Sequence, residues 1–200
     1  MKEYLSSQID QMAQDLKDGK ILAFPTDTVY GVGTIYGNPK ALSRLKSIKN
    51  RPETKPIPMM VSRLEQAKGI VEMTPTATKL AEKLLPGALT LIVPLTEHAD
   101  RQYTNGMDTA ALRIPNAPIL LKVMDQLDRP LMVSSANLSG QPAALCKADA
   151  MAMLPRLDGI LDGECVDNQA STIVDCTTDT IRILREGPIS METLLDALEQ

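Results

Sequence analysis

The stretch FPTDTVYGVGTIYG, residues 24–37, decides how the first half of the chain folds. It follows the apolar run ILAF and precedes PKALSRLKSIKNR, residues 39–51, where Leu42, Leu45 and Ile48 recur at helical spacing. A proline near the start of that second segment suits the first turn of a helix. The sequence therefore predicts a strand, a glycine-rich loop and a helix.

The same alternation of apolar runs and turn residues continues to the end of the chain. Further helices are predicted from Ile9 to Gly19 and at residues 74–85, 117–127, 147–154 and 190–200, and further strands at 56–62, 88–94, 109–115, 131–135, 159–163, 171–177 and 181–187. Helices between strands indicate an α/β fold, and the adjacent strands late in the chain indicate antiparallel pairs in a mixed sheet. No repeat or long linker interrupts the pattern, so we expect one domain over residues 1–200.

Composition narrows the classes of function. The 200 residues are 44% hydrophobic, which is enough for one sizeable core, and they contain no apolar run of membrane-spanning length and no signal peptide pattern. We expect a cytoplasmic protein without a membrane partner. A net charge of −4, no tryptophan and one phenylalanine argue against a general nucleic-acid footprint and against base-stacking platforms.

The cysteines and the single histidine predict no metal site and no catalytic triad. Cys146, Cys165 and Cys176 are odd in number and far apart, which is atypical of a disulfide scaffold or a zinc site. His98 lies in a polar segment that we expect to be a loop. We therefore predict no metal ligands in the chain itself.

The glycine-rich stretch does not match a known dinucleotide motif. A G-x-G-x-x-G pattern starting at Gly31 needs a third glycine where Tyr36 stands, and the chain contains no P-loop pattern. Thr26, Asp27, Thr28 and Tyr30 nevertheless follow an apolar strand, where α/β proteins place ligands. The alternative is that these side chains only cap the turn.

Cations gather in three places. Lys49, Arg51 and Lys55 follow a predicted helix, where they suit either the helix dipole or a phosphate group. Arg113 and Arg185 stand among strand-like apolar residues, so each needs an anion, supplied by an internal carboxylate or by a ligand.

The segment VSSANLSGQPA, residues 133–143, places small polar groups after an apolar strand. Ser134, Ser135, Asn137 and Ser139 lack the G-x-S-x-G pattern of a nucleophilic serine. They suit hydrogen bonds to phosphate, ribose or Mg²⁺-bound water, or else the cap of a turn.

Each of these motifs is common by itself, but their order along the chain resembles that of one known family. FPTDTVYGVG, K-x-R at Lys49 and Arg51, PGALTLIVP, ALRIP, S-x-N at Ser135 and Asn137, STIVD and LREG together resemble the YrdC/TsaC-type threonylcarbamoyl-AMP synthases in their short bacterial form. The resemblance runs from about residue 10 to residue 190. It implies a YrdC-like twisted mixed β-sheet, with helices packed around a large concave basic cavity.

The resemblance also implies an activity. Such a nucleotidyltransferase forms threonylcarbamoyl-AMP and pyrophosphate from L-threonine, bicarbonate and ATP, with Mg²⁺ accompanying ATP. The product serves tRNA threonylcarbamoyladenosine modification through bacterial tRNA threonylcarbamoyl-transfer proteins. A direct contact with tRNA or double-stranded RNA stays open.

The family's contacts transfer to residues of this chain. The resemblance implies ATP contacts at Lys49, Arg51, Lys55, Thr109, Ser135, Asn137 and Arg185, with Lys49 and Arg51 as the catalytic cations, and threonine contacts at Thr28, Arg113, Ser171 and the backbone near Val133. Three positions depart from many relatives: Lys55 replaces an asparagine, Met60 replaces a histidine, and Ala143 replaces a small polar residue.

The sequence leaves two other functions open. The chain could be an RNA-binding module of the same fold, against which its negative charge counts. It could also be a divergent paralogue that uses another carbamoyl or acyl donor, because a fold does not fix a chemistry.

Overall fold

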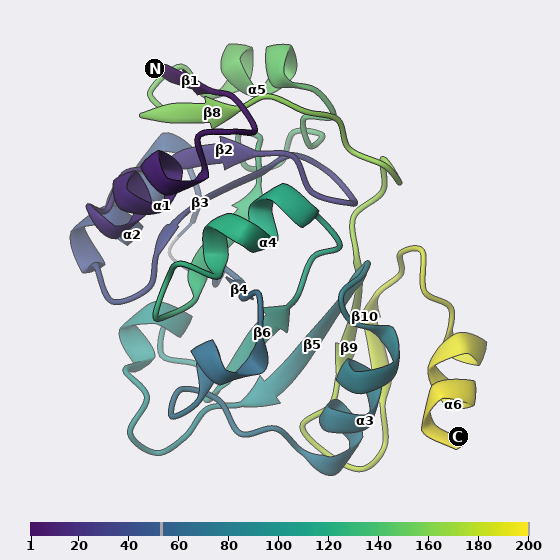
Figure 1. The fold of residues 1–200 in the computed structure, drawn as a ribbon. Coiled ribbons are helices and arrows are strands. Elements are labelled where there is room, and N and C mark those ends of the chain that lie inside the picture. Colours follow the sequence, from purple (N-terminus) through teal and green to yellow (C-terminus); the bar gives the residue numbers. More distant parts are fainter. Residues whose placement is uncertain (53, 200) are drawn as a thin grey trace.

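The structure, a computed structural model, describes residues 1–52 and 54–199 and is organised around a ten-stranded mixed sheet (Figure 1). The strand order is β1-β8-β2-β3-β7-β4-β6-β5-β9-β10. The strands are β1 (Lys2–Tyr4), β2 (Leu22–Phe24), β3 (Gly31–Ile35), β4 (Met59–Met60), β5 (Leu89–Pro94), β6 (Thr109–Arg113), β7 (Leu131–Ser135), β8 (Gly159–Leu161), β9 (Thr172–Asp175) and β10 (Arg182–Arg185). The helices are α1 (Ile9–Lys17), α2 (Pro39–Ile48), α3 (Pro75–Leu84), α4 (Pro118–Met124), α5 (Lys147–Met153) and α6 (Met191–Glu199), with 3₁₀ turns η1 (Leu64–Ala67) and η2 (Arg101–Thr104).

The prediction of a glycine loop after β2 is wrong in one respect. Residues 31–35 form strand β3, which pairs antiparallel with β2 and with β7. The glycines allow close packing inside the sheet: a Cβ on Gly33 would lie 2.8 Å from the carbonyl oxygen of Met132, and one on Gly31 would lie 3.0 Å from the Phe24 ring. The glycines thus mark a crowded strand rather than a free loop.

The other predicted elements appear, with shorter strands in places. Only Met59–Met60 of the predicted strand at 56–62 is a strand, and β1, η1 and η2 were not predicted. The late strands β9 and β10 pair antiparallel as expected, whereas β8 pairs parallel with β1 and β2. Gln200, the last residue of the predicted terminal helix, lies outside the described residues. Within residues 1–52 and 54–199, no helix is long and apolar enough to cross a bilayer.

Alternate residues of the strands enter different hydrophobic clusters, so the sheet is covered on two faces. Leu22 and Phe24 belong to the cluster that includes Met12 and Leu16 of α1 and residues of α4, while Ala23 belongs to the cluster of α2 and α3. In Figure 1, α1 and α4 lie over the part of the sheet near β2 and β3, and α3 and α6 lie together near β9 and β10.

The far part of the sheet is different, because one of its faces borders a cavity. In β5, Leu89, Leu91 and Val93 enter the cluster of α2 and α3, whereas Thr90 and Ile92 line the cavity. Strand β6 shows the same alternation, with Thr109, Ala111 and Arg113 on the cavity side. The fold thereby leaves a hollow on the sheet that polar side chains of several strands can reach.

Candidate active site

The hollow is a cavity of about 560 Å³. Eight of the eleven predicted site residues line it: Thr28, Arg51, Thr109, Arg113, Val133, Ser135, Ser171 and Arg185. Apolar side chains and prolines form much of the remaining wall: Pro56, Ile57, Pro58, Met59, Met60, Ile92, Met107, Ile173 and Leu184. Residues far apart in the sequence therefore converge on one site, as the order of the motifs predicts.

Arg113 anchors one corner of the cavity and has an internal partner. Its Nη2 donates to Oδ1 of Asp27 at 2.5 Å, its Nη1 donates to Oγ1 of Thr28 at 2.9 Å, and its Nε donates to the carbonyl oxygen of Gly87 at 3.1 Å. Of the two anions that the sequence left open for Arg113, the internal carboxylate is therefore present, as Asp27. Burial lowers the pKa of Arg113, Asp27 opposes that shift, and nearby Arg185 adds to it.

The loop that carries Asp27 and Thr28 is shaped by Thr26. Oγ1 of Thr26 donates to the carbonyl oxygen of Val29 at 2.6 Å and accepts from the backbone N–H groups of Thr28 and Val29. This is the turn capping that the sequence left open as an alternative. Thr28 lines the cavity, and a ligand contact at this loop stays a prediction. Tyr30 is buried elsewhere and donates to the carbonyl oxygen of Gly163 at 2.9 Å.

A second polar corner lies at the end of β9. Arg185 donates through Nε and Nη2 to the carbonyl oxygen of Ser171, at 3.0 and 2.7 Å, and through Nη2 to its Oγ at 3.1 Å. The Ser171 hydroxyl also lies 2.8 Å from Oγ1 of Thr90. Burial lowers the pKa of Arg185, but its guanidinium stays protonated at neutral pH. These partners are all neutral, so the charge of Arg185 faces the cavity without an internal counterion among the described residues.

A third corner is formed by Arg51, which follows helix α2. Nε and Nη2 donate to the carbonyl oxygens of Lys55 and Pro56, at 3.0 and 2.6 Å, and Nη1 lies 3.4 Å from Oγ of Ser134. The carbonyl groups of Lys55 and Pro56 thus hold the guanidinium in one orientation. Burial lowers the pKa of Arg51 as well, and its partners are again neutral. The cavity wall therefore carries three arginines, and of these only Arg113 is paired directly with a carboxylate among the described residues, that of Asp27.

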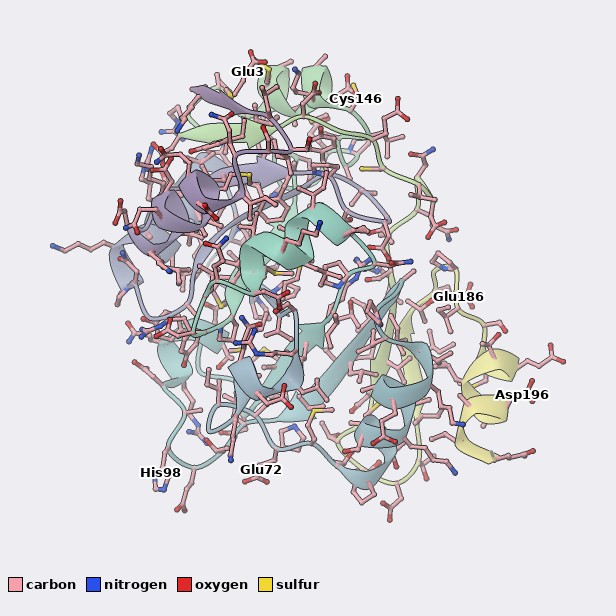
Figure 2. All side chains as sticks on the ribbon, in the orientation of Figure 1. Glu3, Glu72, His98, Cys146, Glu186 and Asp196 are labelled. Atoms are coloured by element: carbon pink, nitrogen blue, oxygen red, sulfur yellow. The ribbon has the colours of Figure 1, made fainter. Side chains whose placement is uncertain are left out.

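Three predicted site residues do not line the cavity: Lys49, Lys55 and Asn137. Lys49 is fully buried behind the wall, and Asn137 is 7% exposed in the turn after β7. Lys55 is exposed, and its carbonyl oxygen holds Arg51. His98, 85% exposed, points away from the body of the protein (Figure 2).

Several residues of the cavity wall were not predicted from the sequence, among them Thr90, Asp175 and Met107. Strand periodicity could have found two of them. Thr90 and Ile92 share one face of β5, and Ile173 and Asp175 share one face of β9. Met107 follows η2 in an irregular segment, so no periodic signal was available for it.

The carboxylates near the cavity provide few ligands for a resident metal ion. Among the described residues, no group of three His, Cys, Asp or Glu side chains is placed to hold one. Asp175 lines the cavity, but it accepts from Thr177 Oγ1 at 2.7 Å and lies 3.5 Å from Nη2 of Arg182. A cation at this site would have to bring other oxygen ligands with it.

Comparison with known proteins agrees with the fold and with the resemblance to a family. Residues 14–187 match the Sua5/YciO/YrdC family model, described as "Telomere recombination". Threonylcarbamoyl-AMP synthase of Vibrio campbellii is 30% identical over 183 residues, covering 89% of this chain and 98% of the relative. Threonylcarbamoyl-AMP synthase of Bacillus subtilis is 34% identical over 192 residues, covering 94% of this chain and 55% of the relative.

A solved structure shows the same architecture. Sua5 of Pyrococcus abyssi complexed with L-threonine superposes with a TM-score of 0.91 at 31% identity, over 98% of this chain and 60% of that one. The chain spans about half the length of the Bacillus relative and nearly all of the Vibrio relative. The chain belongs to the Sua5/YciO/YrdC family.

Proposed function

We propose that the chain is an L-threonylcarbamoyladenylate synthase, which makes threonylcarbamoyl-AMP and pyrophosphate from L-threonine, bicarbonate and ATP. The observation that carries the proposal is the convergence of Arg51, Arg113 and Arg185 with several hydroxyl groups on one cavity of about 560 Å³. That volume falls within the range of small-molecule sites, roughly 300–1,000 Å³. Three arginines in one apolar-walled hollow favour a ligand with several negative charges.

The amino acid is proposed to bind at the Arg113 corner. A guanidinium carries five N–H groups, and three of the nitrogen atoms of Arg113 each donate one bond to Asp27, Thr28 or Gly87. Each terminal nitrogen keeps one further N–H, and the two together suit a carboxylate. Thr28, Ser171 and the backbone near Val133 then contact the hydroxyl and amine of threonine. Met60, which lines the cavity, makes this side of the pocket apolar.

ATP is proposed to bind along the remaining wall. Arg51 offers a fixed guanidinium to the triphosphate, and Lys55, exposed beside it, offers a mobile ammonium. Arg185 and Thr109 also line the cavity, as does Ser135, the last residue of β7. Mg²⁺ would enter with ATP, held chiefly by phosphate oxygens, since the wall supplies few carboxylates.

The reaction needs two bond-forming steps and no covalent bond to the enzyme. The threonine nitrogen attacks the carbon of bicarbonate, the C–N bond forms, and water is lost to leave an N-carboxylate. One oxygen of that carboxylate then attacks the α-phosphorus of ATP, and the bond to the β-phosphate oxygen breaks to release pyrophosphate. The residues contribute by holding the reactants together and by compensating negative charge in a hollow with largely apolar walls.

The proposed product is an acyl phosphate anhydride, which water hydrolyses. We therefore propose that proteins of the bacterial tRNA threonylcarbamoyl-transfer system receive it, and that the cytoplasm is where they meet. The net charge of −4 does not favour direct binding of tRNA or double-stranded RNA by the chain alone.

The test is direct identification of the product. The purified chain is incubated with Mg–ATP, L-threonine and ¹³C-bicarbonate, and the mixture is analysed by mass spectrometry. We expect an AMP adduct that carries both threonine and the labelled carbon. An adduct that forms with another amino acid or with carbamoyl phosphate, but not with these substrates, would instead identify a divergent paralogue.

A further inference from the structure

Lys49 contacts the turn after β7 rather than the cavity. It follows the last residue of α2, its side chain is fully buried, and it is absent from the cavity wall. Its Nζ donates to the carbonyl oxygen of Ser135, to the carbonyl oxygen of Asn137 at 2.7 Å, and to Oδ1 of Asn137 at 3.4 Å. The carbonyl oxygen of Lys49 in turn accepts from the backbone N–H of Ser139 at 2.8 Å. Lys49 thus holds this turn through both its side-chain amine and its backbone carbonyl group.

These contacts fix the orientation of the Asn137 amide. Nδ2 donates to the carbonyl oxygens of Leu138 and Gln141, at 2.9 and 2.7 Å. A flipped amide would turn its oxygen toward those two carbonyl groups and its NH₂ group toward the amine of Lys49. Only the observed orientation satisfies every partner, so Oδ1 of Asn137 acts as an acceptor.

The amide in turn sets the direction of the Ser135 hydroxyl. Oγ of Ser135 lies 2.6 Å from Oδ1 of Asn137 and donates its only proton to it. A serine hydroxyl has one donor and two lone pairs, so the lone pairs are what remain for a ligand. Ser135 lines the cavity, and the neighbouring Ser134 contacts Arg51, the proposed phosphate-binding arginine. A phosphate oxygen has no proton to offer these lone pairs, but a cation bound to the phosphates does accept them.

We infer that Lys49 is a positioning residue that, through Asn137, turns Ser135 into an oxygen ligand for the divalent cation carried by ATP. The inference rests on the proposed function for the identity of the nucleotide. Serine oxygen is a hard ligand of the kind that Mg²⁺ prefers, and one or two protein oxygens beside substrate phosphates are typical of Mg²⁺–nucleotide sites. Lys49 and Asn137 support that ligand without touching the substrate.

The first experiment measures ATP binding by calorimetry, without threonine or bicarbonate, in Mg²⁺ and in EDTA. Loss of a residue that supports a metal ligand typically costs about 10–100-fold in metal affinity. Loss of the ligand itself should cost at least as much, so Ser135→Ala should weaken Mg–ATP binding by about tenfold or more. In EDTA its effect should be about twofold or less. An equal loss in both conditions would overturn the inference and indicate contact with ribose or phosphate.

The second experiment replaces the oxygen by sulfur. Ser135→Cys should bind ATP poorly in Mg²⁺ and regain affinity in Mn²⁺, which accepts sulfur more readily. The matched control is Ser139→Cys, in the same turn, whose Oγ is buried without a partner among the described residues and lies outside the cavity wall. The control should show no such dependence on the metal. Absence of any Mn²⁺ recovery in Ser135→Cys would contradict direct ligation.

The third experiment tests whether Lys49 acts through Ser135. Lys49→Met should weaken Mg–ATP binding by about tenfold in the wild-type background and by about twofold or less in the Ser135→Ala background. Additive losses would show that Lys49 acts independently. Lys46→Met is the control for losing a buried lysine from α2, because Lys46 donates to Asn105 at 2.8 Å, away from this turn. These experiments measure ATP affinity and not product formation, so a failure of this inference can be distinguished from a failure of the proposed function.

Discussion

Arg113 and Asp27 form a buried ion pair, with Nη2 and Oδ1 2.5 Å apart and the two side chains 8% and 7% exposed. Arg113 ends β6 and Asp27 lies in the loop between β2 and β3, so the pair joins two distant parts of the chain. A paired carboxylate allows the guanidinium to remain in the cavity wall when no ligand is present. The pair leaves some N–H groups of Arg113 free of these internal bonds, and the proposed function assigns them to the carboxylate of the amino acid.

Removing the carboxylate should destabilise the protein. We expect Asp27→Asn to lower the free energy of unfolding by about 3–5 kcal/mol, because it leaves a buried charge uncompensated. Urea denaturation measures this loss, and L-threonine should restore a larger share of stability in the variant than in the wild type. The control is Asp128→Asn, whose partner Arg129 is 47% exposed. That change should cost about 1 kcal/mol or less, and equal losses in the two variants would contradict the account.

Arg185 and Arg182 lie on the same strand but have different expected roles. Arg185 lines the cavity, whereas Arg182 is 74% exposed and pairs with Asp175 at 3.5 Å. Removal of a charge-stabilising donor typically slows turnover about 10²–10³-fold, and we expect Arg185→Met to lower kcat/KM for ATP by that order. Arg182→Met should change it only slightly. Steady-state kinetics of pyrophosphate release measures kcat/KM for both variants. Similar losses in the two would show that Arg185 has no special role at the site.

The two glycines of β3 should differ in their tolerance of a methyl group. A Cβ at Gly33 would meet the Met132 carbonyl oxygen and Val133 Cγ2, both at 2.8 Å, whereas one at Gly31 would meet side-chain atoms at 3.0 and 3.1 Å. Overpacking of this kind costs about 1–3 kcal/mol, so Gly33→Ala should lose stability at the upper end of the range and Gly31→Ala less. Thermal unfolding of both variants measures which of them loses more stability. A Gly33→Ala variant as stable as the wild type would show that the strand shifts freely.

Lys49 should make stability depend on pH. Burial, assisted by Arg51, lowers its pKa from an ordinary 10.5 to about 7. Above that value the unfolded chain binds one more proton than the folded chain, so stability rises with pH until the unfolded lysine also loses its proton. The free energy of unfolding of the wild type should rise relative to that of Lys49→Met by up to about 1.4 kcal/mol per pH unit between about pH 7.5 and 9.5.

Chemical denaturation of both proteins across that range is the measurement. Parallel pH profiles would mean that the three oxygen acceptors around Nζ keep the ammonium charged in the folded state. In that case the positioning role would persist, but the pH dependence would not.

Patterns of residues predicted much of the fold, because they report local geometry. Helix α3 begins where Thr74 caps the backbone N–H of Ala77, as its position before a proline and an apolar stripe indicates. Strands β5, β6 and β9 follow from their apolar content. Strand β3 was not predicted, because glycines in a short stretch of sequence usually indicate a turn. Here the glycines are needed because Val133, about a hundred residues later, packs closely against the strand.

The site was predictable as a set of residues, but not as an arrangement. The order of motifs indicated which side chains belong together, and eight of the eleven do line one cavity. Spacing along the chain could not show that Asp27 satisfies Arg113, since the two residues are 86 positions apart. Nor could it show that the side chains of Lys49 and Arg51, two residues apart, point to different environments, one to the turn after β7 and the other to the cavity.

The measurement that tests the central claim most directly is pyrophosphate release from Mg–ATP by the purified chain, with L-threonine and bicarbonate supplied together or omitted in turn. The account predicts release only when both are present, and loss of that release in the Arg51→Ala variant. Release that continues at the same rate without threonine or without bicarbonate would contradict it.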